Sequence, residues 1–306
     1  MHTVSDVSRT GRVVRLPAWF TQEIPGAEAF ARARLFSELG ITTVCQQAQC
    51  PNLGSCFKDS RLTFMILGKV CTRSCRFCAV GKSRGAASAV DPDEPCRISR
   101  MVKSLGLRYV VVTSVNRDDL PDGGAVQFAR TIASIHALGE GVTVEVLIPD
   151  FSGDRTSLKI VTGALPAVVA HNIETVWRLY PEVRPQADYG RSLILLKSIK
   201  ELHPALITKS SLMVGLGETE DEVTGALKDL RGHSCDCVTL GQYLAPSSQH
   251  YPVKDFISPR QFERYRQRAL ALGFTAVVSG PLARSSYNAE QMYYHASSKQ
   301  GHNCYV

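Results

Sequence analysis

The sequence lacks any apolar run near the roughly 18 residues that a membrane-spanning helix needs, so no helical membrane protein is expected. It has no Walker A motif, and no Gly-x-Gly-x-x-Gly follows the first predicted strand, so neither nucleotide-binding fingerprint is present. No basic tract is interleaved with aromatic residues, which disfavours nucleic acid as a partner. Residues 1–20 carry Asp6, Arg9, Arg12 and Arg15 without an apolar core. We therefore expect no secretory signal and a cytoplasmic location.

The composition is that of a folded globular chain. The 306 residues are 44% hydrophobic and 8% aromatic, with a mean hydropathy of -0.05, which excludes a disordered or fibrous protein. Lys and Arg number 35 against 28 Asp and Glu, which gives a formal net charge of +7. Because these charges are scattered along the chain, an acidic protein partner and a solvated surface with no partner both remain open.

Seven short, apolar, β-rich runs alternate with helix-compatible segments. The predicted strands are residues 61–68, 109–115, 142–148, 167–170, 207–215, 237–243 and 275–279, and the predicted helices include 27–39, 125–138, 192–202, 220–230 and 261–272. This alternation predicts an α/β fold, a partial (β/α)6-type TIM barrel with a late seventh strand, and leaves a doubly wound open sheet as the alternative. We expect a barrel domain over residues 61–280, an N-terminal extension over 1–60 and a C-terminal extension over 281–306.

Polar residues follow the predicted strands at their C-terminal ends, where sites form in barrels and in open sheets. They are Asn116, Arg117, Asp118, Asp119, Pro149, Asp150, Asn172, Glu174, Gly217, Glu218, Gln242 and Tyr243. We therefore expect the functional site at this end of the sheet.

Ten cysteines stand out, and most of them crowd one segment. Without an export signal, this usage favours metal binding or catalysis over disulfides. Cys71, Cys75 and Cys78 form a Cys-x3-Cys-x2-Cys motif directly after the first predicted strand. Thiolates select zinc, copper or iron–sulfur, but structural zinc prefers four ligands, and no matching second pair is present. Three thiolates suit a [4Fe–4S] cluster that leaves one iron open.

The motif, with Phe77 before its last cysteine, resembles that of the radical S-adenosylmethionine (SAM) superfamily. The resemblance implies that the open iron binds the methionine end of SAM. It further implies that one electron from the cluster cleaves SAM to a 5'-deoxyadenosyl radical.

A second cysteine motif narrows the resemblance to the lipoyl synthase family. Cys45, Cys50 and Cys56 lie in CQQAQCPNLGSC, and residues 284–287 read RSSY. The similarity also covers VVVTSVNRDD, VEVLIPDF, HNIETVWRLYPEVRPQADY, TKSSLMVGLGE, LGQYLAPSSQHYPV and SGPLARSSY, in order, from about residue 38 to 287. It implies a second, auxiliary [4Fe–4S] cluster held by these three cysteines and Ser286. Such an enzyme is a sulfurtransferase that inserts sulfur at C6 and C8 of a protein-bound octanoyl-lysine, with the auxiliary cluster as sulfur donor.

Five further residues are expected to contact SAM, each with a structural alternative. Gly215 and Glu218 keep half of a Gly-x-Ile-x-Gly-x-x-Glu element of the superfamily, but an ordinary strand-to-helix turn would look the same. Asn172, Glu174 and Arg184 lie in or near HNIETV, where Glu174 and Arg184 could equally form a structural ion pair.

The remaining cysteines carry no ligand pattern. Cys96 falls in a predicted helix, Cys235 and Cys237 open a predicted strand, and Cys304 lies in the C-terminal tail.

The resemblance also implies partners and leaves rival functions to test. Expected partners are an octanoylated carrier, either the lipoyl domain of a dehydrogenase E2 component or the glycine-cleavage H protein, and a reductant such as flavodoxin or ferredoxin. Another radical SAM sulfurtransferase would place its auxiliary ligands differently. A non-catalytic iron–sulfur carrier would have no use for an open iron.

Overall fold

Seven parallel strands form one sheet whose order follows the chain. In the computed structural model, which describes residues 6–7, 13–14, 16–21, 25–58, 61–83, 88–139 and 141–301, each strand pairs with its neighbour in sequence. The strands are β3 (Thr63–Ile66), β6 (Tyr109–Ser114), β7 (Thr143–Leu147), β8 (Val168–Ala170), β9 (Ile207–Val214), β10 (Cys237–Gln242) and β11 (Ala276–Gly280). A doubly wound sheet would reverse its order at a switch point. The predicted partial barrel is therefore confirmed, and no ladder of the described residues closes it between β3 and β11.

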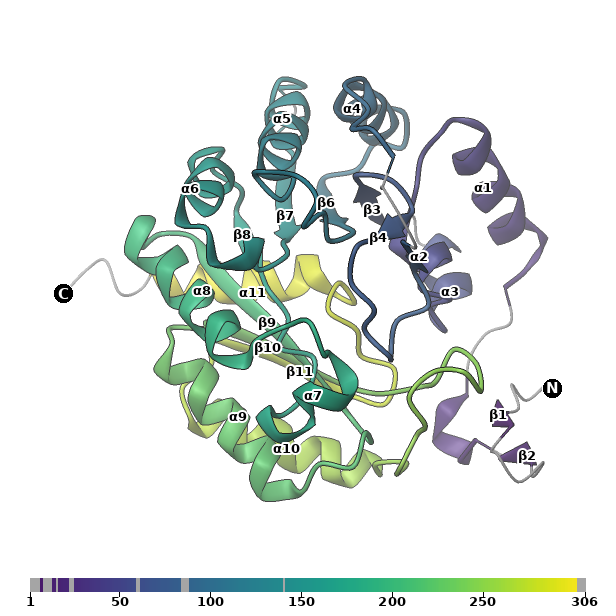
Figure 1. Cartoon of the computed structure of the whole chain (residues 1–306), viewed down its shortest axis with the longest axis vertical. Coiled ribbons are helices and arrows are strands. Elements are labelled where there is room, and N and C mark those ends of the chain that lie inside the picture. The colour runs from purple at the N-terminus through teal and green to yellow at the C-terminus, as the bar shows by residue number, and fades with distance from the viewer. Residues whose placement is uncertain are drawn as a thin grey trace.

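Helices pack around the outside of the curved sheet (Figure 1). They are α4 (Glu94–Ser104), α5 (Ala125–His136), α6 (Arg155–Gly163), α8 (Tyr189–Leu202), α9 (Glu220–Gly232) and α10 (Pro259–Ala271). Side-chain caps fix several of their starts. Asp154 accepts hydrogen bonds from two backbone N–H groups of α6, and Thr219 forms a capping box with Glu222 at α9. The helices predicted at 125–138, 192–202, 220–230 and 261–272 are confirmed with ends shifted by up to three residues.

Two apolar clusters cover the two faces of the sheet. Val168 and Val169 are adjacent in β8, but they belong to different clusters because neighbouring strand residues point to opposite faces. Val169 joins the large cluster that includes the surrounding helices. Val168 packs with Met292 and Ala296 of α11 (Ala289–Gly301), a helix that the sequence did not predict. The C-terminal helix thus covers the inner face of the barrel.

A buried ion pair crosses the same inner face. Lys209 Nζ of β9 lies 2.8 Å from Glu145 Oε1 of β7, and each side chain is only 1% exposed. Tyr109 donates a hydrogen bond of 2.6 Å to the other oxygen of Glu145, and its ring packs 5.8 Å from that of Tyr293 in α11. The pair ties β7 to β9 across the intervening β8.

The first part of the chain packs beside β3 and is more helical than expected. Pro51, Asn52 and Gly54 favour a loop, but residues 44–58 contain α2 (Val44–Gln47) and α3 (Leu53–Lys58). Tertiary contacts explain this, because Phe57 packs edge-on against Phe36 of α1 (Ala27–Glu38) at 5.7 Å. Thr43 caps α2, and the Thr42 carbonyl accepts from Met65 N–H over 2.8 Å.

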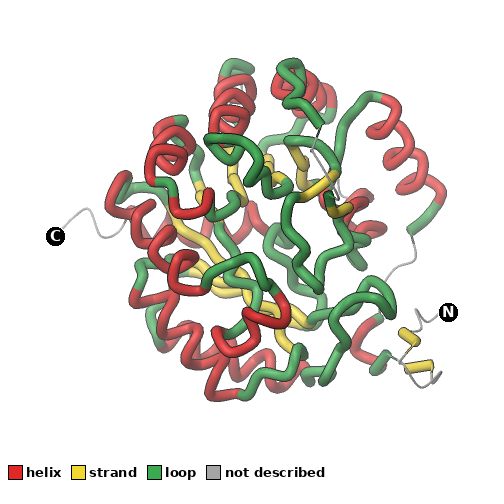
Figure 2. The backbone as a smooth tube through the Cα atoms, viewed as in Figure 1, coloured by secondary structure: helices red, strands yellow, loops and turns green. Residues whose placement is uncertain are grey.

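The remaining elements are short. They are β1 (Asp6–Val7), β2 (Val13–Val14), β4 (Val70–Cys71), β5 (Gly81–Lys82), α7 (Tyr180–Val183) and the 3-10 turns Ala18–Phe20, Phe151–Gly153 and Trp177–Leu179. Figure 2 shows long loops gathered beside β3 and β4. Among the described helices, none has the length and apolar character required to span a bilayer.

Candidate functional site

Cys71, Cys75 and Cys78 lie on the loop that follows β3, residues 69–80, called here the second cysteine loop. All three are free and half-buried. Two backbone N–H groups point at the sulfur of Cys71, from Asn116 at 3.3 Å and from Arg73 at 3.5 Å. Burial, with smaller contributions from the charges of Cys75 and Cys71, raises the pKa of Cys78 to about 12.

The loop is held by a buried charge network. Arg73 donates to Asp118 over 2.8 and 2.7 Å and to Asp150 over 2.6 Å, and Arg191 of α8 lies 3.1 Å from the second oxygen of Asp150. Burial alone would raise the pKa of Asp150, but the hydrogen bond and charge of Arg73 lower it to about 2. These carboxylates follow β6 and β7, so Arg73 fastens the second cysteine loop to two strand ends.

Other bonds fix the loop further along. Ser74 N–H and its hydroxyl both donate to Gln186 Oε1, at 2.6 and 2.9 Å. Arg76 donates through its N–H to the carbonyl of Val183 at 2.9 Å, and its own carbonyl accepts from Tyr251 N–H at 2.8 Å. The loop therefore presents its cysteines from a constrained backbone.

Cys45, Cys50 and Cys56 lie on residues 44–58, called here the first cysteine segment. Cys45 belongs to α2, Cys56 to α3, and Cys50 N–H donates to the Cys45 carbonyl at 3.0 Å. Burial raises the pKa of Cys45 to about 12, with smaller contributions from Cys50 and Cys56. The three cysteines thus lie on one short segment folded by α2 and α3.

Residues 281–288, called here the serine loop, contact the first cysteine segment. Asn52 Nδ2, between two of its cysteines, donates to the Leu282 carbonyl at 2.7 Å. Arg61 donates to Asn288 at 2.8 Å. Burial lowers the pKa of the Arg284 guanidinium, while the charges of Cys50 and of Glu174 oppose that shift. The half-buried Ser286 therefore lies on a loop in contact with the cysteine triad with which it is expected to act.

A glycine at the end of β10 makes room for the serine loop. A Cβ atom on Gly241 would lie 2.0 Å from the carbonyl oxygen of Ala283. Gln242 N–H donates to the Pro281 carbonyl at 3.3 Å. Close backbone approach of this kind excludes every residue with a side chain.

The residues expected to contact SAM lie beside both motifs. Asn172 Nδ2 donates to Glu174 Oε1 at 3.0 Å, and Asn172 Oδ1 accepts from Ser285 at 3.0 Å. Arg184 donates to the Asn172 carbonyl and to Tyr180 Oη, each at 3.0 Å. Within the described part of the chain, Glu174 and Arg184 form no ion pair at 4 Å or less, so the structural alternative for them is not found. Burial raises the pKa of Glu174, and the Arg184 charge partly offsets the shift.

Gly215 and Glu218 have a clear structural role. Glu218 accepts from the N–H groups of Gly215 at 2.5 Å and of Leu216 at 2.9 Å, which caps the turn after β9. Gly215 has a φ of +93°, and a Cβ atom there would lie 2.4 Å from the Asp255 carbonyl. These contacts favour the strand-to-helix turn for this half-motif.

Single-metal chemistry is not supported. Among the described residues, no three His, Cys, Asp or Glu side chains could hold one metal ion, Cys235 and Cys237 included. A [4Fe–4S] cluster is different because each thiolate binds a separate iron, so its ligands need not converge on one point. Two cysteine triads on constrained segments, none of them in a disulfide, fit such clusters. Cys96 lies exposed on α4, and Cys304 is outside the described residues.

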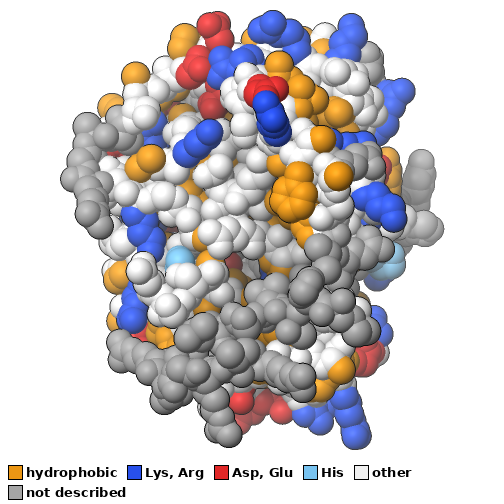
Figure 3. All heavy atoms as spheres, turned by 90° about the vertical axis from the view of Figure 1, so that its right-hand side faces the viewer, with side chains coloured by type: hydrophobic (Ala, Val, Ile, Leu, Met, Phe, Trp, Pro, Cys, Tyr) orange, Lys and Arg blue, Asp and Glu red, His pale blue; other side chains and the backbone are white. Residues whose placement is uncertain are grey.

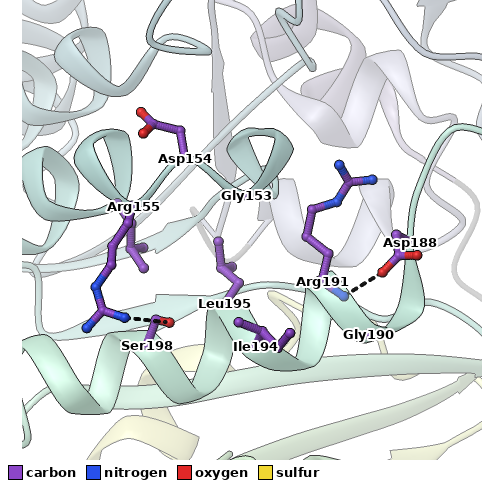
Figure 4. Close-up of a pocket in the computed structure, with 10 residues that line it drawn as sticks. Gly153, Asp154, Arg155, Asp188, Gly190, Arg191, Ile194, Leu195 and Ser198 are labelled. Carbon is purple, nitrogen blue, oxygen red and sulfur yellow. Dashed lines mark hydrogen bonds between the residues drawn. The ribbon is translucent and has the colours of Figure 1, made fainter.

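Two cavities of the described residues lie near the ends of the strands. One of about 380 Å³ separates α6 from α8 and is lined by Arg155, Asp188, Arg191, Ile194 and others, as Figure 4 shows. Another of about 510 Å³ adjoins the ends of β6 and β7 beside Arg117 and Phe151. Neither cavity is lined by a cysteine, but the second is lined by Asn116, whose N–H points at the sulfur of Cys71. On the face drawn in Figure 3, Lys and Arg side chains are scattered among other types, which matches the scattered charge of the sequence.

Comparisons with known proteins decide the family. The Radical SAM superfamily profile matches residues 65–230, more than half of the chain. A lipoyl synthase of Caldanaerobacter subterraneus subsp. tengcongensis is 52% identical over 277 residues, covering 90% of this chain and 96% of that protein. The chain belongs to the lipoyl synthase family. A Chlorobaculum tepidum member is 51% identical over 275 residues, which cover 90% of this chain and 94% of the relative. The resemblance drawn from the cysteine motifs is thereby confirmed.

Solved structures agree on the fold alone. Methylornithine synthase (PylB) superposes with a TM-score of 0.51 at 13% identity, covering 71% of this chain and 70% of that one. HydG, a maturase of the [FeFe]-hydrogenase, gives 0.53 at 15% identity, covering 71% and 55%. The partial barrel is shared, although these sequences have diverged widely.

Sequence reasoning missed the supports of the site. Arg73, Asn52 and Ser285 each lie within or beside a recognised motif, but nothing in the sequence indicates their distant partners. Asp118 and Asp150 were predicted to lie near the site because each follows a predicted strand. Nothing else in the sequence indicated the ion pairs around Arg73.

Proposed function

We propose that the chain is a lipoyl synthase that inserts sulfur at C6 and C8 of a protein-bound octanoyl-lysine. The observation that carries the proposal is the contact between the first cysteine segment and the serine loop, made by Asn52 and Leu282. The second cysteine loop is held at the ends of β6 and β7, and the serine loop reaches the segment after β8 through Ser285 and Asn172. A carrier of electrons alone has no need for an auxiliary triad with a serine nearby.

The proposed ligands form two sets. Cys71, Cys75 and Cys78 would hold the cluster that binds SAM, and Cys45, Cys50, Cys56 and Ser286 would hold the auxiliary cluster. When bound, these groups supply the electron that cleaves SAM and the sulfur that enters the substrate. The buried thiols must lose their protons to bind iron, which makes loading dependent on pH.

The protein contributes position and shielding. Arg73 with its carboxylates holds the second cysteine loop at the strand ends. N–H groups of Asn116 and Arg73 stabilise a negative sulfur at Cys71. The first cysteine segment and the serine loop lie close by, and they would exclude water from a reaction that breaks unactivated C–H bonds. Asn172, Glu174 and Arg184 stay candidates for binding SAM.

The finer assignments remain part of the proposal. The substrate would be an octanoylated carrier, the E2 lipoyl domain or the glycine-cleavage H protein, and the reductant flavodoxin or ferredoxin. The boundaries 1–60, 61–280 and 281–306 and a cytoplasmic location likewise stay predictions.

Two triple variants test the proposal. Replacing Cys71, Cys75 and Cys78 by alanine should abolish reductive SAM cleavage and sulfur insertion together. Replacing the other triad should retain SAM cleavage and abolish sulfur insertion only. Equal loss of both activities in the two variants would argue against two clusters with separate roles.

Ser286 has its own test. A serine oxygen is a harder ligand than thiolate and a weaker match for cluster iron, so this corner should be labile. We expect Ser286→Cys to retain auxiliary iron and to slow sulfur release, as followed by iron analysis and carrier mass. Unchanged insertion kinetics would refute the lability argument.

A further inference from the structure

The serine loop is tied to the centre of the barrel by the residue next to Ser286. Ser285 Oγ donates to Asn172 Oδ1 over 3.0 Å, although the two residues are 113 positions apart. Asn172 Nδ2 donates in turn to Glu174 Oε1 at 3.0 Å. Both ends of the amide are engaged, so its oxygen is directed at Ser285.

The acceptor side of this contact is rigid. The Asn172 side chain is buried, and its carbonyl accepts from Arg184 at 3.0 Å. Glu174 N–H donates to the Ser211 carbonyl at 3.0 Å, and the Glu174 carbonyl accepts from Met213 N–H at 2.8 Å. The segment after β8 is thus fastened to β9.

The donor side has less support of its own. Ser285 and Ser286 lie in a turn outside any helix or strand. The loop approaches closely at Ala283, against Gly241, and is held at Leu282 by Asn52. Ser285 joins the turn to the segment after β8, while Arg61 holds the far end of the turn through Asn288.

We propose that Ser285 is a positioning residue for the auxiliary cluster. Through Asn172 it fixes the direction in which the Ser286 oxygen is presented to the first cysteine segment. This bond sets how firmly the serine corner of the cluster holds its iron. Asn172 then supports the serine loop, in addition to or in place of a contact with SAM. The inference rests on the proposed assignment of Ser286 as a ligand.

Iron release measures this effect directly. The full chain would carry Ala at Cys71, Cys75 and Cys78, so that only the auxiliary cluster is loaded, and iron loss to a ferrous chelator would be followed without oxygen. We expect Ser285→Ala to release its first iron roughly 2- to 10-fold faster, the range for one lost hydrogen bond. Ser285→Thr keeps the hydroxyl and should restore the parent rate. Equal rates for Ser285→Ala and the parent would overturn the proposal.

A matched control separates this effect from general loosening. Ser157 of α6 donates to Asp154 at 2.6 Å, and α6 lies across the fold from α2 and α3, which carry the first cysteine segment (Figure 1). Ser157→Ala should leave iron release unchanged. If Ser157→Ala accelerates release as much as Ser285→Ala does, the effect is global and the proposal fails.

A double-mutant cycle tests the route through Asn172. Asn172→Ala should reproduce the faster release, and the double variant with Ser285→Ala should be no faster than the faster single variant. Multiplicative rates would mean that the two residues act independently, which contradicts the proposal. A change in SAM affinity without a change in iron release would make Asn172 a SAM contact only, and would also contradict it.

Ser286→Ala separates this inference from the assignment on which it rests. If Ser286→Ala releases iron at the parent rate, the serine ligand itself is wrong. If Ser286→Ala accelerates release and Ser285→Ala does not, the ligand stands and only the role of Ser285 is wrong.

Discussion

Replacing Arg73 with methionine is the sharpest test of how the fold supports the site. The variant keeps an unbranched apolar side chain but removes the charge, which leaves Asp150, 1% exposed, with Arg191 as its remaining cation. Removing one partner of a buried ion pair typically costs 3–5 kcal/mol. The pKa of Asp150, about 2 against an ordinary 3.8, gives an independent value of about 2 kcal/mol. We therefore expect the free energy of unfolding at pH 7 to fall by about 3 kcal/mol.

The assay is urea unfolding of the cluster-free chain, followed by circular dichroism. Because the folded pKa of Asp150 is depressed, its stabilisation is complete above pH 3.8 and is lost as the pH falls through about 2. The difference between parent and variant should therefore shrink over that range. Arg178→Met is the control, since it breaks an exposed pair with Glu222 and should cost less than about 1 kcal/mol. Equal losses in the two variants, or a difference that does not change with pH, would refute the role given to Arg73.

Three further predictions follow from other contacts. Gly241→Ala should displace the serine loop and lower the iron content of the auxiliary cluster. Gly280→Ala, whose added Cβ would meet nothing within 4 Å, should bind iron normally, and equal iron content in the two variants would contradict the predicted clash. Lys209→Met should lower the free energy of unfolding by about 3 kcal/mol, because it leaves the buried Glu145 without its cation. The further change Glu145→Gln should restore most of that free energy, as measured by the midpoints of urea unfolding. Carrier affinity should weaken as salt rises, because the net charge of +7 favours an acidic carrier face, and a constant affinity would count against this.

The sheet was predictable because its signal is local. Each strand is a short apolar run, and the seven runs fall where the sequence placed them. The order of the strands could not be read directly, since a doubly wound sheet has the same alternation. Pairing along the chain from β3 to β11 settled that question.

Where the prediction failed, tertiary contacts outweigh local preference. Pro51, Asn52 and Gly54 favour a loop, but packing of Phe57 on Phe36 supports the short α3. The inner face of the barrel is covered by α11, whose apolar contacts include β8 and β9, far away in the sequence, as well as the preceding β11.

The residues of the candidate site likewise fall into those that the sequence predicts and those that depend on tertiary contacts. Cysteine spacing predicts both triads, because ligands that are close in sequence leave a readable pattern. The residues that hold these segments in place left no such pattern. Asn52 donates to the Leu282 carbonyl, 230 residues away, and Ser285 donates to the Asn172 side-chain amide, 113 residues away. Such pairings depend on the fold.

An anaerobic single-turnover experiment tests the central claim most directly. The reconstituted protein would be mixed with SAM, a reductant and an octanoylated carrier domain, and the carrier followed by intact mass. The account predicts a gain of two sulfurs on the carrier with matching loss of the cluster at Cys45, Cys50 and Cys56. SAM cleavage with an unchanged carrier mass would contradict the assigned substrate, and sulfur gain with that cluster intact would contradict the assigned sulfur source.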